Sequence, residues 1–272
     1  RTFDGIEVDI NEVPYTVLVS NRCTGALVHL EWVLTAAHCF VGINFQNTSV
    51  GLGTSDKNNS LINIAIENVY IYPEYLNHIS DLLRAPHDIA LVKLEVPAIL
   101  SKSIQILNIE ETEWPSQGER QCTLAGFGIN TNNNNKLHSS PFDVTRGCDC
   151  IHDREIICTK ILNDGDASPC FGDGGAVLVC NNKGVAVTSH GLAGTYCNSP
   201  RPTNVSVQGC GIKDTYFLFS YIEPHLEWYY DIVAPRDSHG HLFSTASIHT
   251  VKCIQYFDLI TIVQLFVLLI RH

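Results

Sequence analysis

Residues 32–39 read Trp32-Val-Leu-Thr-Ala-Ala-His38-Cys39, an apolar run that ends in a histidine beside a cysteine. The run predicts a buried β-strand followed by a turn that presents His38, with Cys39 as an anchor next to it. Other short apolar runs, separated by Gly, Asn, Asp and Pro, recur through the first two hundred residues. This rhythm predicts an all-β fold.

A second apolar run begins directly after an acidic residue. The stretch His87-Asp88-Ile-Ala-Leu-Val-Lys-Leu94 places a carboxylate at the start of another buried strand. A lone histidine is usually structural, but an aspartate that accepts a hydrogen bond from the histidine Nδ1–H orients the ring as a general base. The sequence therefore predicts that His38 and Asp88 form such a pair.

A third stretch, Cys170-Phe-Gly-Asp-Gly-Gly-Ala-Val-Leu-Val-Cys180, completes a resemblance to the trypsin/chymotrypsin family of serine peptidases over residues 2–233. The family pattern around its nucleophile is C-x-G-D-S-G-G-P-x-x-C. The ten-residue spacing of the cysteines is kept here, which leaves the alignment little freedom. By this resemblance, Gly174 stands at the position of the nucleophilic serine.

Further matches fall in the family's order: Arg1 followed by Thr-Phe-Asp-Gly5, the stretch 122–128, Thr188-Ser-His-Gly191, and Trp228 in a closing helix. The resemblance implies two six-stranded antiparallel β-barrels with a C-terminal helix, and a catalytic cleft between the barrels.

The closing helix also has its own signal in the sequence. Within residues 219–233, Tyr221, His225, Trp228 and Ile232 fall three or four residues apart, so they can share one helical face.

The resemblance makes His38 and Asp88 remnants of a triad whose nucleophile is missing. In this mechanism the serine hydroxyl attacks the carbonyl and carries the acyl group, so nothing around His38 replaces it. Its removal lowers kcat by about 10⁶-fold. Gly172 and Gly174 still offer the backbone N–H groups of an oxyanion hole, so the cleft is expected to bind a carbonyl that it does not cleave.

Ser168 and Gly191 correspond to the family's specificity pocket. A serine at the pocket floor suits apolar or aromatic substrate side chains. The bulky Tyr216 and Phe217 fall near the same pocket, and we expect them to narrow or block it.

Activation in the family frees an apolar N-terminus, whose amine pairs with the aspartate before the serine. Here that pair would be Thr2 and Asp173. With Arg1 attached, insertion of the amine should fail.

Eleven cysteines in 272 residues indicate an oxidising compartment and export. The resemblance implies the pairs Cys23–Cys39, Cys122–Cys180 and Cys170–Cys197, and Cys158 with Cys148 or Cys150. The spare member of the last group could bond to Cys210, which would leave Cys253 odd. Sequons at Asn47, Asn58 and Asn204 are predicted glycosylation sites.

The net charge of −11, without a Lys/Arg cluster, argues against a nucleic-acid partner. Residues 234–252 form a polar linker, and residues 253–270 are strongly apolar. Three interpretations of this tail stay open: a lipid-anchor signal that follows the small residues 244–247, a segment docked on the domain, or a weak membrane-surface segment. His239 and His241 make a poor metal site in a flexible linker, so no metal or cofactor is expected.

Three functional hypotheses follow. The leading one is a secreted, non-catalytic homologue that binds a protein or peptide partner in an extracellular proteolytic pathway. The second is an active serine endopeptidase of chymotrypsin-like specificity, either through another nucleophile, with Ser168 the nearest in sequence, or through a natural serine at position 174. The third is a membrane-tethered recognition module that depends on its tail.

Overall fold

The computed structural model describes residues 3–76, 85–115, 118–129, 135–198 and 209–234. The chain divides into two compact units, Arg1–Leu226 and Glu227–His272. The first unit contains all the described strands. In the second, the described residues are 227–234, which comprise the last helix except its first residue, and Ala234.

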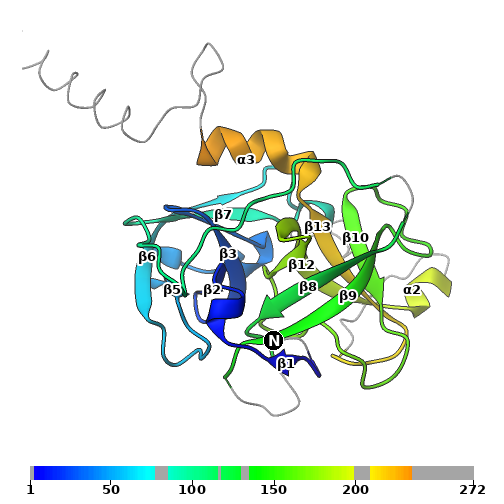
Figure 1. The fold of residues 1–272 in the computed structure, drawn as a ribbon. Helices are drawn as coiled ribbons and strands as arrows, with labels where there is room; N and C mark the ends of the chain where they lie inside the picture. The colour runs from blue at the N-terminus through cyan, green and yellow to red at the C-terminus, as the bar shows by residue number, and fades with distance from the viewer. Residues whose placement is uncertain (1–2, 77–84, 116–117, 130–134, 199–208, 235–272) are drawn as a thin grey trace, which may run out of the picture. The chain divides into compact units, whose positions relative to one another are not determined.

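Six strands of the first unit close into an antiparallel barrel, drawn in blue to cyan in Figure 1. In barrel order they are β2 (Thr16–Val19), β3 (Cys23–His29), β4 (Trp32–Thr35), β7 (Ala90–Leu94), β6 (Ile62–Ile71) and β5 (Ser49–Leu52). Because closure leaves no free edge, every strand pairs on both sides.

Six later strands form a second ring of pairings, drawn in green to orange (Figure 1). They are β8 (Arg120–Gly126), β9 (His138–Arg146), β10 (Ile156–Lys160), β13 (Thr215–Tyr221), β12 (Lys183–Ala193) and β11 (Val177–Cys180), and the β8–β9 pairing closes the ring. The short strand β1 (Ile6–Glu7) adds to β9 from outside. The predicted fold class, two six-stranded barrels with a short C-terminal helix, is confirmed.

Each barrel encloses its own apolar core. Leu34 and Leu91 are fully buried in the first barrel, and Leu124 and Phe219 in the second. The apolar runs seen in the sequence supply these side chains, and their removal from water stabilises the fold by about 25 cal/mol per Å².

Short helices connect the strands or follow them. They are η1 (Ile10–Glu12), η2 (Ala37–Phe40), η3 (Phe45–Asn47), η4 (Ala85–His87), α2 (Thr195–Asn198), η5 (Glu223–His225) and α3 (Leu226–Val233). The helical face predicted from residue 221 onward is wrong at its start, because Tyr221 ends strand β13. Tyr221 is fixed there by pairing with Ala186 of β12, and helical structure begins only at Glu223.

Five disulfides join cysteines of the described residues: Cys23–Cys39, Cys122–Cys180, Cys148–Cys158, Cys150–Cys197 and Cys170–Cys210. The predicted bond Cys170–Cys197 is therefore wrong, and so is the suggestion that the spare cysteine bonds to Cys210.

The reason lies in where the chain returns to the second barrel. Gly211 N donates a hydrogen bond of 2.8 Å to Ser168 Oγ, which brings Cys210 beside Cys170. Cys197 lies instead on α2, at the end of β12, where it meets Cys150.

Several predictions concern residues outside the described ranges. These are Thr2, the sequon at Asn204, Cys253, the linker from residue 235 onward and the apolar segment 253–270. Among the described residues, no helix has the length and apolar character needed to cross a membrane.

Candidate functional site

His38 lies in the turn of 3-10 helix that follows strand β4. The strand delivers the chain to this turn, and the Cys23–Cys39 disulfide ties the neighbouring residue back to β3. Asp88 lies between η4 and β7, and β7 pairs directly with β4. The two predicted partners therefore come from adjacent strands, and the structure brings them together.

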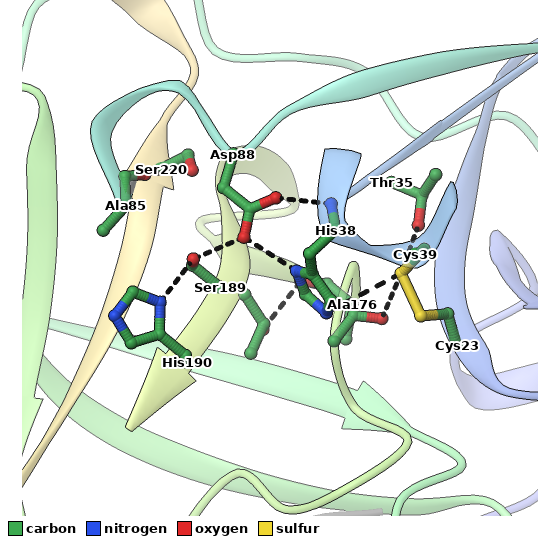
Figure 2. Close-up of polar contacts among 12 residues, drawn as sticks. Cys23, Thr35, His38, Cys39, Ala85, Asp88, Ala176, Ser189, His190 and Ser220 are labelled. Atoms are coloured by element: carbon green, nitrogen blue, oxygen red, sulfur yellow. Dashed lines mark hydrogen bonds and ion pairs between the residues drawn. A yellow bond between two sulfur atoms is a disulfide. The ribbon is translucent and has the colours of Figure 1, made fainter. Parts of the chain in front are cut away.

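The Asp88 carboxylate accepts three hydrogen bonds (Figure 2). His38 N donates to Oδ1 at 2.8 Å, and His38 Nδ1 donates to Oδ2 at 2.7 Å. Ser189 Oγ donates to the same Oδ2 at 2.5 Å. The His38 ring is thereby held with Nδ1 on the carboxylate and Nε2 on the opposite side, which is the orientation of a general base.

Asp88 is buried, with 2% of its surface exposed. Burial alone would raise the pKa of its carboxyl, but the attraction of His38 and the hydrogen bonds from His38 and Ser189 outweigh it, so the pKa lies below its ordinary value. The side chain is therefore a carboxylate at neutral pH.

Ser189 and His190 extend this network along β12. Ser189 Oγ lies 2.9 Å from His190 Nδ1, and because the serine proton points to Asp88, the histidine is the donor in this contact. Figure 2 shows the order His190, Ser189, Asp88, His38. The match of residues 188–191 to the family pattern gave no indication of this hydrogen-bonded link.

Opposite His38, the loop before β11 carries Gly174. Its backbone is tied to the first barrel, since Thr24 N donates to Gly174 O at 3.0 Å and Thr24 Oγ1 donates to Gly172 O at 2.8 Å. Gly175 has φ +83°, and a Cβ there would lie 2.4 Å from Thr24 O. Only glycine suits that position without displacement of the loop.

Gly174 differs from its neighbour, because its φ lies outside the left-handed region. A Cβ built at Gly174 would meet a single group, the His38 ring, with Nε2 at 2.4 Å. The backbone thus permits a side chain at 174. The imidazole of His38 occupies the space that the side chain would need.

Gly172 and Gly174 both line the cleft beside His38. Over the part of the chain that the structure describes, neither of their N–H groups donates to another backbone group. Two amide donors therefore remain available next to the histidine.

The cleft has a volume of about 260 Å³. Its wall includes Gly191 and Phe217, and a Cβ at Gly191 would lie 3.2 Å from the Phe217 ring. Tyr216 points to the other face of β13, where its hydroxyl donates to Asp149. Phe217 alone of the two bulky residues therefore narrows this space.

Ser168 does not line the cleft. It is fully buried, and its Oγ accepts the hydrogen bond from Gly211 N. Its backbone pairs with Phe3, with Phe3 N to Ser168 O at 2.6 Å and Ser168 N to Phe3 O at 3.1 Å. The structure thus places the start of the described chain against the second barrel.

Asp173, the predicted partner of the Thr2 amine, is also fully buried. Its carboxylate accepts hydrogen bonds of 2.9 Å from Gly128 N and Cys170 N. Thr2 itself lies outside the described residues.

The sequence profile of the trypsin family matches residues 2–214. The chain belongs to the trypsin family. The family assignment made from the sequence is confirmed.

Curated relatives in the trypsin family include kallikrein-1E2 of Equus caballus, which is 25% identical over 84% of this chain and 88% of the relative. Anionic trypsin of Canis lupus familiaris is 28% identical over 72% of this chain and 81% of the relative. A solved structure of a mutant of human heparin binding protein superposes with a TM-score of 0.67 at 22% identity, over 85% of this chain and 95% of that protein. This structural likeness supports the trypsin-like fold.

Proposed function

We propose that this trypsin-family chain is a non-catalytic homologue, exported from the cell, that acts by binding a protein or peptide partner in an extracellular proteolytic pathway. The observation that carries the proposal is Gly174 facing His38 Nε2. The base and its aspartate are oriented as in a peptidase, but the group on which the base would act is missing.

No neighbouring hydroxyl or thiol of the described residues is placed to act as the nucleophile in place of a residue 174 side chain. Acyl transfer needs a hydroxyl or thiol whose proton passes to Nε2 while its oxygen or sulfur attacks the carbonyl. Ser189 lies on the Nδ1 side of the ring and donates to Asp88. Ser168 is buried under Gly211, and Cys39 is held in a disulfide.

Other features of the cleft favour recognition. The N–H groups of Gly172 and Gly174 line it, and we assign them to an oxyanion hole that can still hold a carbonyl oxygen. Phe171, beside them, is 60% exposed, and exposed aromatic residues are frequent anchors of protein interfaces. A peptide segment laid across this cleft would be bound and not cut.

The position of Phe217 argues against the competing hypothesis of chymotrypsin-like specificity. The ring lies against Gly191, in the space that a large substrate side chain would use. Ser168 does not reach the cleft surface as the floor of a pocket would. The membrane-tethered alternative depends on residues 253–270, which lie outside the described ranges.

The compartment and partner class follow from the surface chemistry. Five disulfides suit an oxidising environment, and the sequons at Asn47 and Asn58 are exposed and accessible for glycosylation. We do not propose heparin as a ligand, although the fold resembles that of heparin binding protein, because a chain of net charge −11 repels a polyanion.

Peptide hydrolysis tests the proposal. The chain is incubated with fluorogenic peptides that carry aromatic or basic side chains before the scissile bond, beside a His38→Ala variant as the control. We expect no cleavage that depends on His38. Turnover by the parent chain that disappears in His38→Ala would show an active peptidase, whereas turnover equal in both would come from a contaminant.

A further inference from the structure

A second group of polar side chains gathers on the other side of the turn that carries Asp88. His87 ends η4, Glu155 lies between β9 and β10, and His225 ends η5. Their ligand atoms, one from each residue, all lie within 4.8 Å of one another. No function of the cleft uses these three residues.

Two of the three separations between these atoms have the length expected between ligands of one metal ion. His87 Nδ1 lies 3.3 Å from His225 Nε2 and 3.4 Å from Glu155 Oε2. Both separations exceed the usual range of N–H···N or N–H···O bonds, about 2.7–3.2 Å. Ligands about 2.0–2.2 Å from a tetrahedral ion are about 3.3–3.6 Å apart.

The surroundings orient the two rings as metal ligands. His225 Nδ1 lies 2.7 Å from Tyr221 O, and because a carbonyl only accepts, this nitrogen carries the proton and Nε2 carries the lone pair. Tyr72 stacks on the His87 ring and meets the His225 ring edge-on. Glu74 Oε2 lies 3.6 Å from His87 Nε2, so a negative charge lies beside the ring nitrogen that would not bind the ion.

The three residues differ in exposure, so the site has one buried ligand and one side that is open to solvent. His225 is 1% exposed, whereas the side chains of His87 and Glu155 are 20% and 38% exposed. An ion could therefore enter from the solvent side and keep a water as its fourth ligand.

We infer that His87, Glu155 and His225 form a binding site for Zn²⁺. Two imidazoles and one carboxylate suit a borderline transition ion, whereas Ca²⁺ and Mg²⁺ prefer oxygen ligands alone. The site is independent of the missing nucleophile. The bound ion would connect η4, directly before Asp88, to η5 and to the start of β10, and so brace the turn that positions Asp88.

Calorimetric titration of the full chain with Zn²⁺ tests the site. We expect one equivalent to bind with a dissociation constant of about 1 μM or lower. His87→Gln and Glu155→Gln should each weaken binding by more than about 100-fold, beyond the loss usual for an outer-shell change. Glu155→Gln alters a partly exposed side chain, so it keeps the test valid if His87→Gln folds poorly.

Two control variants separate this site from other histidines. His152→Gln removes an exposed histidine outside the cluster, and the double variant His239→Gln/His241→Gln removes the histidines of the linker. Binding should persist in both controls. Failure of the parent chain to bind at about 100 μM Zn²⁺, or equal binding by the parent and Glu155→Gln, would overturn the proposal.

Discussion

The two sides of the cleft differ in what they present to it: one presents paired side chains, and the other presents backbone alone. On the side of the first barrel, the side chains of His38 and Asp88 remain paired at 2.7 Å, with a third partner in Ser189. On the side of the second barrel, the loop around Gly174 keeps its backbone ties to Thr24 but has no side chain to offer. The backbone ties of this loop therefore form without a side chain at position 174.

The contrast between Gly174 and Gly175 explains how the loop keeps its shape. Gly175 must be glycine because its φ is positive and Thr24 O lies close to any Cβ. Gly174 is under no such backbone constraint, and only the movable His38 ring faces it. A side chain at position 175 would therefore displace the backbone of the loop, whereas one at position 174 would displace only a side chain.

The largest expected effect on stability comes from Gly175→Ala. The added Cβ would be forced against the backbone of Thr24 in a left-handed conformation, so we expect a loss of about 4 kcal/mol. Urea unfolding monitored by circular dichroism measures this loss as a shift of the midpoint at constant m-value.

Gly174→Ala is the matched control for this prediction, because it adds the same methyl group one residue earlier. Only the His38 ring has to move, so the expected loss is about 1 kcal/mol. Equal losses of unfolding free energy in Gly174→Ala and Gly175→Ala would show that the backbone tolerates a side chain no better at position 174 than at position 175.

Asp88→Asn tests the other side of the cleft and should cost about 2–3 kcal/mol, because a buried acceptor of three hydrogen bonds loses its charge. The pKa of Asp88 is lowered in the folded state, so its stabilising contribution is complete above the ordinary value of 3.8 and is lost as the pH falls through the folded value. The parent chain should therefore lose this contribution in acid below about pH 4, and the variant should lack that component.

Unfolding free energies measured from pH 7 down to strong acid distinguish these cases. If Asp88→Asn and the parent chain show the same acid dependence, the carboxylate is not held by its three donors as described.

Ser189→Ala should have a smaller effect than Asp88→Asn, about 1.5 kcal/mol, since one of three donors to Asp88 is removed. The pKa of Asp88 should rise toward its ordinary value, so the acid-linked loss becomes smaller and is complete at a higher pH. A nuclear magnetic resonance titration of the carboxyl carbon checks the direction of this change. A lower pKa in the variant would contradict the proposed donor role.

The sequence predicted what depends on local pattern and on order along the chain. The apolar runs predicted the strands, and the fixed spacing from Cys170 to Cys180 placed Gly174 in the loop that the structure brings to His38. His38 and Asp88 could be paired because each is carried by a recognisable motif.

The sequence could not predict contacts between segments that are far apart in the chain and carry no recognisable motif. Cys170 and Cys210 are 40 residues apart, and nothing local distinguishes Cys210 from Cys197 as the partner. His87 and His225 are separated by 138 positions, and Ser189 and Asp88 by 101, so only the packing of η4 against the second barrel brings them together.

Covalent labelling with an organophosphonate probe for serine hydrolases distinguishes a non-catalytic chain from an active peptidase. We expect no adduct on the parent chain or on Gly174→Ala, and an adduct on Gly174→Ser. In that variant the His38 ring must retreat by about 1 Å, from 2.4 Å to an ordinary contact of 3.4 Å with the new Cβ. An adduct on the parent chain at the rate of an active peptidase would show that the chain has a nucleophile and is not a non-catalytic homologue.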